Sequence, residues 1–290
     1  MPIYRQTYRH FDGEVRRHFR WMIVVKQELR VLLGMKLFML LLLGALLHFL
    51  LRLLQVVAYD VVVQDPNNPL SAMLKQVTML VVDKDMMRAF VQFQTPLVFL
   101  MMLYIGAGMI SNDFSNNLME VYFSKPITWL DYALGKVLTL LFVGLSITAV
   151  PSVILVLVHN LLLPGMETIQ TSWWWIFAAI GYSLIIVLPT ALGILASSSL
   201  LQSQNYAAIA VFLVIVANSS MGLLLSQLLY DRDYALVAFP YTIETIGEYL
   251  FGIRRQHQAS LPIALSYVAF VCLASLWIIF RRVRRAEVAA

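Results

Sequence analysis

The chain has 290 residues, of which 60% are hydrophobic and only 13% carry a charged side chain. Soluble domains carry about 25% charged residues, so this composition excludes an ordinary soluble protein and predicts an integral membrane protein. A single cysteine excludes a framework of disulfide bonds and a cysteine-rich metal site. The net charge of +5 comes mainly from the two ends of the chain, which indicates membrane topology and lipid headgroups rather than nucleic acid as the partner.

Residues 1–36 are predicted to form a basic arm that contains an amphipathic helix. Apolar residues recur at every third or fourth position between Phe11 and Leu32, which is the spacing of one face of a helix. A basic amphipathic helix beside a membrane span is typical of segments that lie in the headgroup layer. We therefore predict an in-plane helix here, the alternative being a charged flank that only sets the orientation of the chain.

Six apolar stretches follow, each close to the length of about 20 residues that a helix needs to cross a bilayer. The predicted fold class is an all-α integral membrane protein with six transmembrane helices. These spans form one transmembrane domain over residues 37–280, and a basic tail over 281–290 follows it. Pro151 is expected to kink the third span. The predicted spans are 37–58, 91–109, 132–159, 174–196, 206–229 and 261–280.

Ionisable side chains are expected to be nearly absent from the second to sixth spans. The first span carries His48 and Arg52, and Arg52 lies where a long side chain can reach the headgroups. For His48 we predict packing or hydrogen bonding rather than a proton relay, because no carboxylate in the other spans is placed to partner it. An ion-driven transporter or an intramembrane enzyme would need polar groups in the spans. We therefore expect no enzyme activity of this chain, and any work that it does would draw energy from a separate subunit.

The longest polar interruption between two predicted spans is the segment 110–136. We predict a short helix on the membrane surface in this segment, capped by Ser111 or Asn112 and ended by Pro126. A helix placed in this way between two spans is suited to receive a push from a soluble partner. Its apolar side would consist of Leu118, Met119, Tyr122 and Phe123.

The next helix has a start signal of its own. Thr128 is followed three residues later by Asp131, which is the spacing of a capping box. We therefore expect the third span to begin directly after Thr128.

The distribution of basic residues predicts the orientation of the chain. Fourteen of the 21 Lys and Arg residues lie in the arm, in the segment 110–136 and in the tail, against six in the two long segments on the other side. Basic residues are enriched on the cytosolic side of membrane proteins. The predicted location is the cytoplasmic (inner) membrane, with both termini in the cytosol.

The order of these elements resembles the permease subunits of ABC transporters of the type-2 exporter class. Their in-plane helix carries a K-x-E-L-R element, which residues 26–30 match as KQELR. Lys125 stands where Arg is usual in the coupling region of the family, and Asn117 stands where Gly is common. Asn tolerates a left-handed backbone better than most residues, so the same turn is expected. The coupling region of the family is matched at Ile110, Ser111, Asp113, Glu120, Ser124, Pro126, Thr128, Tyr132, Gly135 and Lys136.

The resemblance implies a membrane-spanning permease that moves a substrate when a separate ATPase pushes its coupling helix. This chain would hold no cofactor, since ATP and Mg²⁺ would be bound by a cytosolic ABC ATPase subunit present in two copies. A second permease chain, identical or paralogous, would complete the complex. The weakly polar spans favour a lipid, a peptide or another amphipathic compound as the substrate.

The resemblance also implies where the ATPase would bind. Asp113, Glu120 and Lys125 are the expected polar contacts, and Tyr122 and Phe123 would pack into a groove of the ATPase. The alternative function, from a different class, is a membrane anchor or assembly subunit that transports nothing. The full predicted interface consists of Asp113, Asn117, Glu120, Tyr122, Phe123, Lys125, Pro126 and Thr128 in the loop, with Lys26, Glu28 and Arg30 in the in-plane helix.

Overall fold

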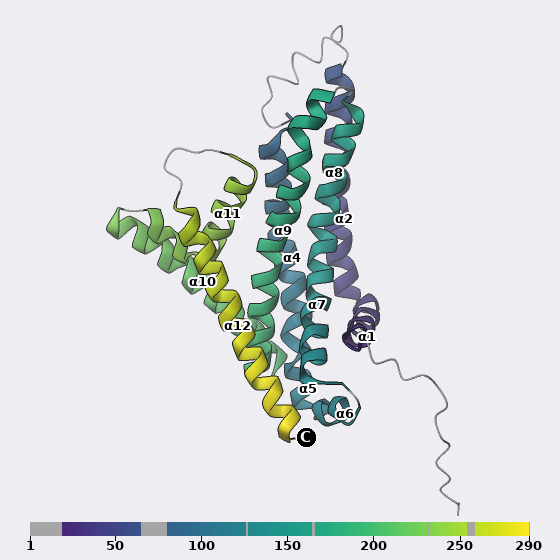
Figure 1. Ribbon diagram of the computed structural model, residues 1–290, viewed down its shortest axis with the longest axis vertical. Coiled ribbons are helices and arrows are strands. Elements are labelled where there is room, and N and C mark those ends of the chain that lie inside the picture. The colour runs from purple at the N-terminus through teal and green to yellow at the C-terminus, as the bar shows by residue number, and fades with distance from the viewer. Residues whose placement is uncertain are drawn as a thin grey trace, which may run out of the picture.

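The computed structural model describes residues 19–64, 80–125, 127–163, 166–230, 232–253 and 259–289. Every element within these ranges is a helix, so the predicted all-α class is confirmed (Figure 1). Six helical stretches are long and apolar enough to cross a membrane, which confirms the multi-pass membrane character. Residues 1–18 of the predicted arm and Pro126 lie outside the described residues.

The elements are, in chain order, α1 (Trp21–Leu33), α2 (Lys36–Gln64), α4 (Lys84–Met109), α5 (Ser111–Ser115), α6 (Leu118–Phe123), α7 (Trp129–Ile147), α8 (Ala149–Leu162), α9 (Met166–Leu200), α10 (Gln204–Leu229), the short 3-10 helix η1 (Arg232–Val237), α11 (Phe239–Leu250) and α12 (Leu261–Ala289). The candidate spans are Lys36–Val62, Lys84–Ser115, Trp129–Leu162, Ser172–Leu200, Gln204–Leu229 and Leu261–Glu287. The predicted tail therefore continues the last helix through Ala289.

Several helices extend well beyond the predicted spans, and α2 and α4 do so on the side opposite α5 and α6. The first span was expected to end at residue 58, but α2 continues to Gln64; the second was expected to begin at residue 91, but α4 begins at Lys84. The side chain of Asp83 accepts a hydrogen bond from the backbone N–H of Met86 at 2.9 Å and so caps α4 earlier than expected. The longer α2 also brings Asp60 into the bundle, where the side chain is fully buried.

The third span is interrupted at Thr148, between α7 and α8. Pro151, three residues later, has no backbone N–H with which to bond the carbonyl of Ile147. The hydroxyl groups of Thr148 and Ser152 donate to nearby backbone carbonyls, at 2.9 Å to Gly144 and at 2.8 Å to Thr148. Such side-chain bonds satisfy carbonyl groups where a helix is broken inside a membrane.

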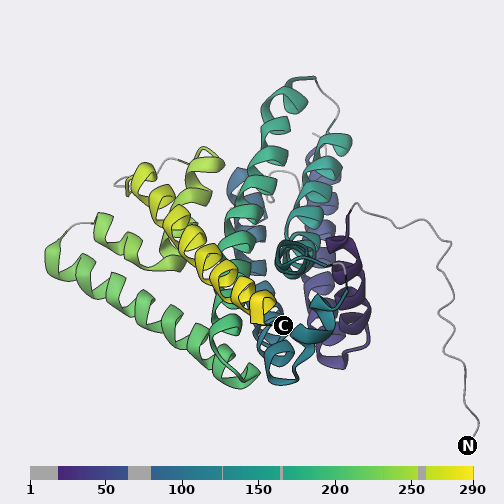
Figure 2. The same cartoon turned by 60° about the horizontal axis from the view of Figure 1, so that its bottom comes forward.

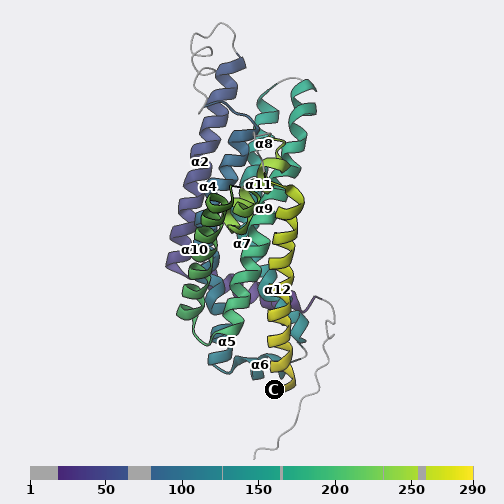
Figure 3. The ribbon, with the colours of Figure 1, turned by 90° about the vertical axis from the view of Figure 1, so that its left-hand side faces the viewer.

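α9 is the central helix of the bundle, with α4, α7, α8 and α12 packed around it (Figures 1 and 3). Its apolar stretch is 67% buried, against 11% for those of α2 and α10. α10 and the upper part of α12 in Figure 1 lean away from α9, and α11 packs between them and α9 there. Gly247 allows this approach of α11, because a Cβ atom there would lie 2.5 Å from the ring of Tyr182 on α9.

α1 lies crosswise to the long helices, at the end of α2 that is lowest in Figure 1. It packs against α7 at Gly135, where an added Cβ atom would lie 2.6 Å from the Cβ of Val24. The other side of α1 exposes several large apolar side chains, among them Met22, Ile23 and Leu33. α1, α5, α6 and the C-terminal end of α12 lie together at one end of the molecule, the lower end in Figure 1, and Figure 2 brings this end forward.

Candidate functional site

The segment predicted to hold a coupling helix consists of two short helices, α5 and α6, rather than one. Asn117 separates them with a left-handed backbone (φ 55°, ψ 27°), as expected for the Asn that stands in place of Gly. The prediction that Ser111 or Asn112 caps this segment is wrong. No side chain caps α5, and the hydroxyl group of Ser111 instead donates to the carbonyl of Ala107 at 2.7 Å.

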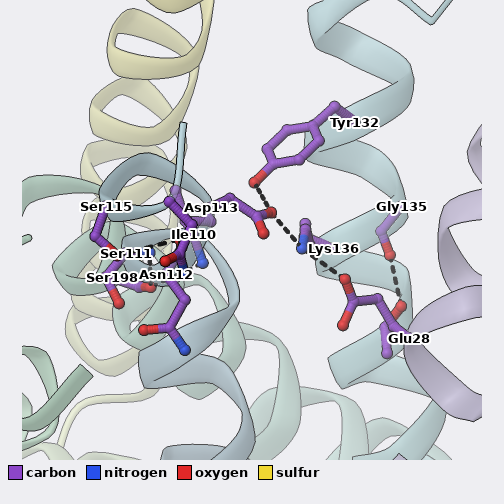
Figure 4. Close-up of polar contacts among 12 residues, drawn as sticks. Glu28, Ile110, Ser111, Asn112, Asp113, Ser115, Tyr132, Gly135, Lys136 and Ser198 are labelled. Carbon is purple, nitrogen blue, oxygen red and sulfur yellow. Dashed lines mark hydrogen bonds and ion pairs between the residues drawn. The ribbon is translucent and has the colours of Figure 1, made fainter. Parts of the chain in front are cut away.

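Ser198 of α9 anchors the start of α5 (Figure 4). Its Oγ accepts hydrogen bonds from the backbone N–H groups of Ile110 at 3.1 Å and Ser111 at 3.0 Å, and it donates to the carbonyl of Ala107 at 2.8 Å. The side chain is fully buried. One hydroxyl group thus satisfies the backbone where α4 passes into α5, and it ties this junction to the central helix.

We expect Ser198→Ala to lower the free energy of unfolding by about 1–3 kcal/mol, because two buried N–H groups lose their acceptor. The measurement is reversible unfolding of the purified chain in mixed micelles. Ser146→Ala is the matched control, since its exposed hydroxyl group bonds only within α7; its effect should stay within about 0.5 kcal/mol. Equal losses from both variants would contradict an anchoring role for Ser198.

A buried cluster of charged groups joins α1, α5 and α7, which we call the Lys136 cluster (Glu28, Asp113, Tyr132 and Lys136; Figure 4). The Nζ of Lys136 lies 2.6 Å from Oε1 of Glu28 and 2.7 Å from Oδ2 of Asp113. The hydroxyl group of Tyr132 donates to the same Asp113 oxygen at 2.7 Å. Lys136 is 1% exposed and Tyr132 is fully buried.

The cluster is held by electrostatics in a site that is largely closed to water. A buried ammonium group is costly unless it is paired and hydrogen-bonded, and here two carboxylates pair with it. Nζ also lies 5.2 Å from the ring centre of Tyr132 and 5.8 Å from that of Tyr122, within reach of cation–π attraction. Burial raises the pKa of Tyr122. The positive charge of Lys136 lowers this pKa and the negative charges of Asp113 and Glu28 raise it; the net shift is upward, so this phenol stays neutral.

The structure brings some of the predicted interface residues together inside the protein and leaves others at its surface. Asp113, expected to contact a partner, is 7% exposed because Lys136 and Tyr132 hold it. Tyr122 and Phe123 are half-buried, with ring centres 5.1 and 6.3 Å from that of Tyr132. Those that lie exposed are Asn117, Glu120, Lys125, Thr128, Lys26 and Arg30.

The prediction that the second to sixth spans lack ionisable groups is wrong for Lys136 and for His159, both of which are buried. His159 belongs to a second polar pair, at the end of the bundle opposite α5 and α6. Its Nδ1 lies 2.8 Å from Oδ2 of Asp60, and its ring stacks on Trp175 at 5.5 Å. The hydropathy pattern did not predict this pair, because it ends the first span before Asp60 and so places Asp60 in the segment that follows.

The end of α12 and the start of α10 also contact the α5–α6 region. Arg282 of α12 lies 5.1 Å above the ring of Phe114, and the backbone N–H of Trp129 at the start of α7 donates to Glu287 at 3.2 Å. The side-chain amide of Asn112 on α5 donates to Gln204 of α10 at 3.3 Å. The capping box predicted for α7, with Thr128 and Asp131, is confirmed.

Among the described residues, no group of three or more His, Cys, Asp and Glu side chains is arranged to hold a metal ion. A comparison with protein-family models finds no match for the chain, and a comparison with curated proteins finds none. The resemblance to exporter permeases therefore rests on the matched motif positions and on the order of the elements.

Proposed function

We propose that this chain is the membrane-spanning permease subunit of an ATP-driven exporter of the type-2 ABC class. A separate cytosolic ATPase, present in two copies that bind ATP and Mg²⁺, would push on α5 and α6. A second permease chain, identical or paralogous, would complete the membrane part of the complex. One observation carries the proposal: the α5–α6 segment is exposed on one side and joined on its other side to α7 and α9 by buried polar contacts, with Lys136 of α7 also paired to Glu28 of α1.

The exposed side of this segment is where an ATPase would bind. Glu120 and Lys125 present opposite charges to solvent, and the apolar side chain of Val121 between them is 54% exposed. A mixed surface of this kind suits a protein partner, since charges give specificity and apolar contacts give affinity. Because Asp113 and Ser111 are bonded to neighbouring helices, a displacement of α6 by the ATPase would be transmitted to α7 and α9.

The α1 helix fits the role of an in-plane helix on the same side of the membrane. Its exposed apolar residues, such as Ile23 at 65%, would enter the headgroup layer, and the exposed Lys26 and Arg30 would face lipid phosphates. The ion pair of Glu28 with Lys136 links α1 to the third span. The excess of basic residues at this end supports a cytosolic position for it.

The substrate is proposed to be a lipid, a peptide or another amphipathic compound, because the spans present few polar groups. Transport by the complex reconstituted in liposomes tests this part of the proposal. Movement of a hydrophilic solute alone would contradict it.

The experiment that tests the proposed function is an affinity pull-down from native membranes solubilised in mild detergent. We expect an ATPase subunit with the unchanged chain and at least a tenfold loss of it with the double variant Glu120→Lys/Lys125→Glu, since both side chains are exposed and the fold does not depend on them. Asp85→Lys, also exposed but at the opposite end of α4, is the matched control and should retain the ATPase.

If no ATPase accompanies the unchanged chain while other membrane complexes stay intact, the permease assignment fails. If an ATPase binds but its activity is indifferent to the double variant, the anchor or assembly subunit becomes the better assignment.

A further inference from the structure

Two cavities of about 400 and 450 Å³ lie beside the central helix α9. Both have Phe99, Thr190, Ile215 and Phe239 in their walls, so they lie side by side, and together we call them the α9 cavity. Its upper part lies among α4, α9, α10 and α11, and its lower part lies between α9, α10 and α12. The combined size falls in the range of small-molecule binding sites.

The lower part of the α9 cavity offers a hydrocarbon surface. Most of its few polar side chains already have partners: the amide of Asn218 donates to the hydroxyl group of Tyr267 at 3.0 Å and accepts from the backbone N–H of Phe239 at 2.7 Å. The hydroxyl group of Thr190 donates to a carbonyl of its own helix at 2.6 Å. A ligand in this part therefore meets apolar atoms and satisfied polar groups, which favours an aliphatic chain.

The upper part of the cavity has a polar end. Gln92 and Glu244 stand in its wall, and Arg88 lies directly behind them, with Nη1 at 2.6 Å from the Gln92 amide oxygen and at 3.7 Å from the Glu244 carboxylate. The Nε of Arg88 is buried and has no hydrogen-bond partner among the described residues. A polar headgroup would find hydrogen-bonding groups here that the lower part does not offer.

Part of the wall of the α9 cavity is exposed on the outside of the chain. Val214 of α10 and Leu200 of α9 belong to its wall and are 66% and 57% exposed. Both helices are candidate spans, so lipid acyl chains are the molecules that surround this part of the wall.

We propose that the α9 cavity binds one acyl chain of a membrane phospholipid, with the headgroup at the Gln92–Glu244 end. The site goes beyond the proposed transport function and does not depend on it, because binding requires neither an ATPase nor a second permease chain.

Gly193 provides a direct test, because it lines the cavity and an added Cβ atom there would meet no other atom within 4 Å. Gly193→Leu therefore starts from a Cβ position that is free and extends its side chain into the cavity, and Ile215→Trp fills the cavity from α10. Gly181→Leu is the matched control on α9: it lies outside the cavity, and its nearest neighbour would be Leu250 at 3.7 Å.

The experiment uses the full chain in phosphatidylcholine liposomes that contain a phospholipid with a photoreactive diazirine on its acyl chain. After illumination, labelled peptides are identified by mass spectrometry. Labelling of the exposed apolar face of α2 by surrounding lipid, at Leu43 and Leu54 for example, serves as the internal reference. We expect labelling of the cavity walls to exceed that reference at least threefold, and to fall at least fivefold in Gly193→Leu and Ile215→Trp but not in Gly181→Leu.

Cavity labelling no stronger than that of α2 would overturn the proposal. So would strong labelling that both cavity-filling variants leave unchanged, or labelling that an apolar peptide displaces and excess unlabelled phospholipid does not. All variants are compared only after their unfolding transitions show that they are folded. If Gly193→Leu does not fold, Ile215→Trp still tests whether filling the cavity lowers the labelling.

Discussion

Replacing Lys136 by Met is expected to lower the free energy of unfolding by about 3–5 kcal/mol, because it leaves two carboxylates without their cation in a closed site. Asp113 is 7% exposed and Lys136 is 1% exposed, so water cannot replace the lost partner. Glu28 and Asp113 would then repel each other, and the link that Lys136 of α7 forms to α1 and to α5 would be lost. The measurement is reversible unfolding in mixed micelles, with the separation of α1 from α5 followed by paired spin labels.

The triple variant Glu28→Gln/Asp113→Asn/Lys136→Met separates the effect of charge from that of packing. With all three charges removed, no buried charge stays unpaired, and we expect most of the stability to return. If the proposed complex with an ATPase forms, its coupling should not return with the stability, because the ionic link between α1 and α7 is absent. A single Lys136→Met variant as stable as the unchanged chain would contradict the assigned role of the cluster.

Local sequence signals predicted much of this architecture. Apolar stretches of sufficient length located all six spans, since crossing a bilayer demands length and hydropathy and little else. The capping box at Thr128 follows from residue spacing alone, and so does the left-handed turn at Asn117. The break of the third span close to Pro151 follows from the missing N–H of proline.

Contacts between distant residues could not be predicted in this way. Glu28, Asp113 and Lys136 lie on three helices, and only their packing shows that the charges face one another rather than solvent. The sequence therefore predicted that the side chain of Asp113 contacts a partner, whereas in the structure it forms its bonds within the chain. Ser198 gave no signal beyond its place in a run of three serines, yet it bonds the junction of α4 with α5.

The pair of Asp60 and His159 carries the second large expected effect. We expect His159→Leu to lower the free energy of unfolding by about 3–5 kcal/mol, because it leaves a wholly buried carboxylate unpaired. Among the described residues, Oδ1 of Asp60 has no hydrogen-bond partner even in the unchanged chain, and the bond of Oδ2 to His159 is the one that pairs this carboxylate. The loss would loosen α2 from α8 at the end opposite α5 and α6, and the same unfolding measurement detects it.

His48→Leu distinguishes this effect from the mere loss of a buried imidazole. The His48 ring stacks on Phe90 at 5.2 Å, and within the described part of the chain its Nδ1 has no hydrogen-bond partner, so an apolar replacement should change the stability by less than about 1 kcal/mol. The double variant Asp60→Leu/His159→Leu removes both members of the pair and should regain most of what His159→Leu loses. If the double variant is as unstable as the single one, the ring of His159 stabilises the bundle by stacking on Trp175, and the charge of Asp60 is not the cause.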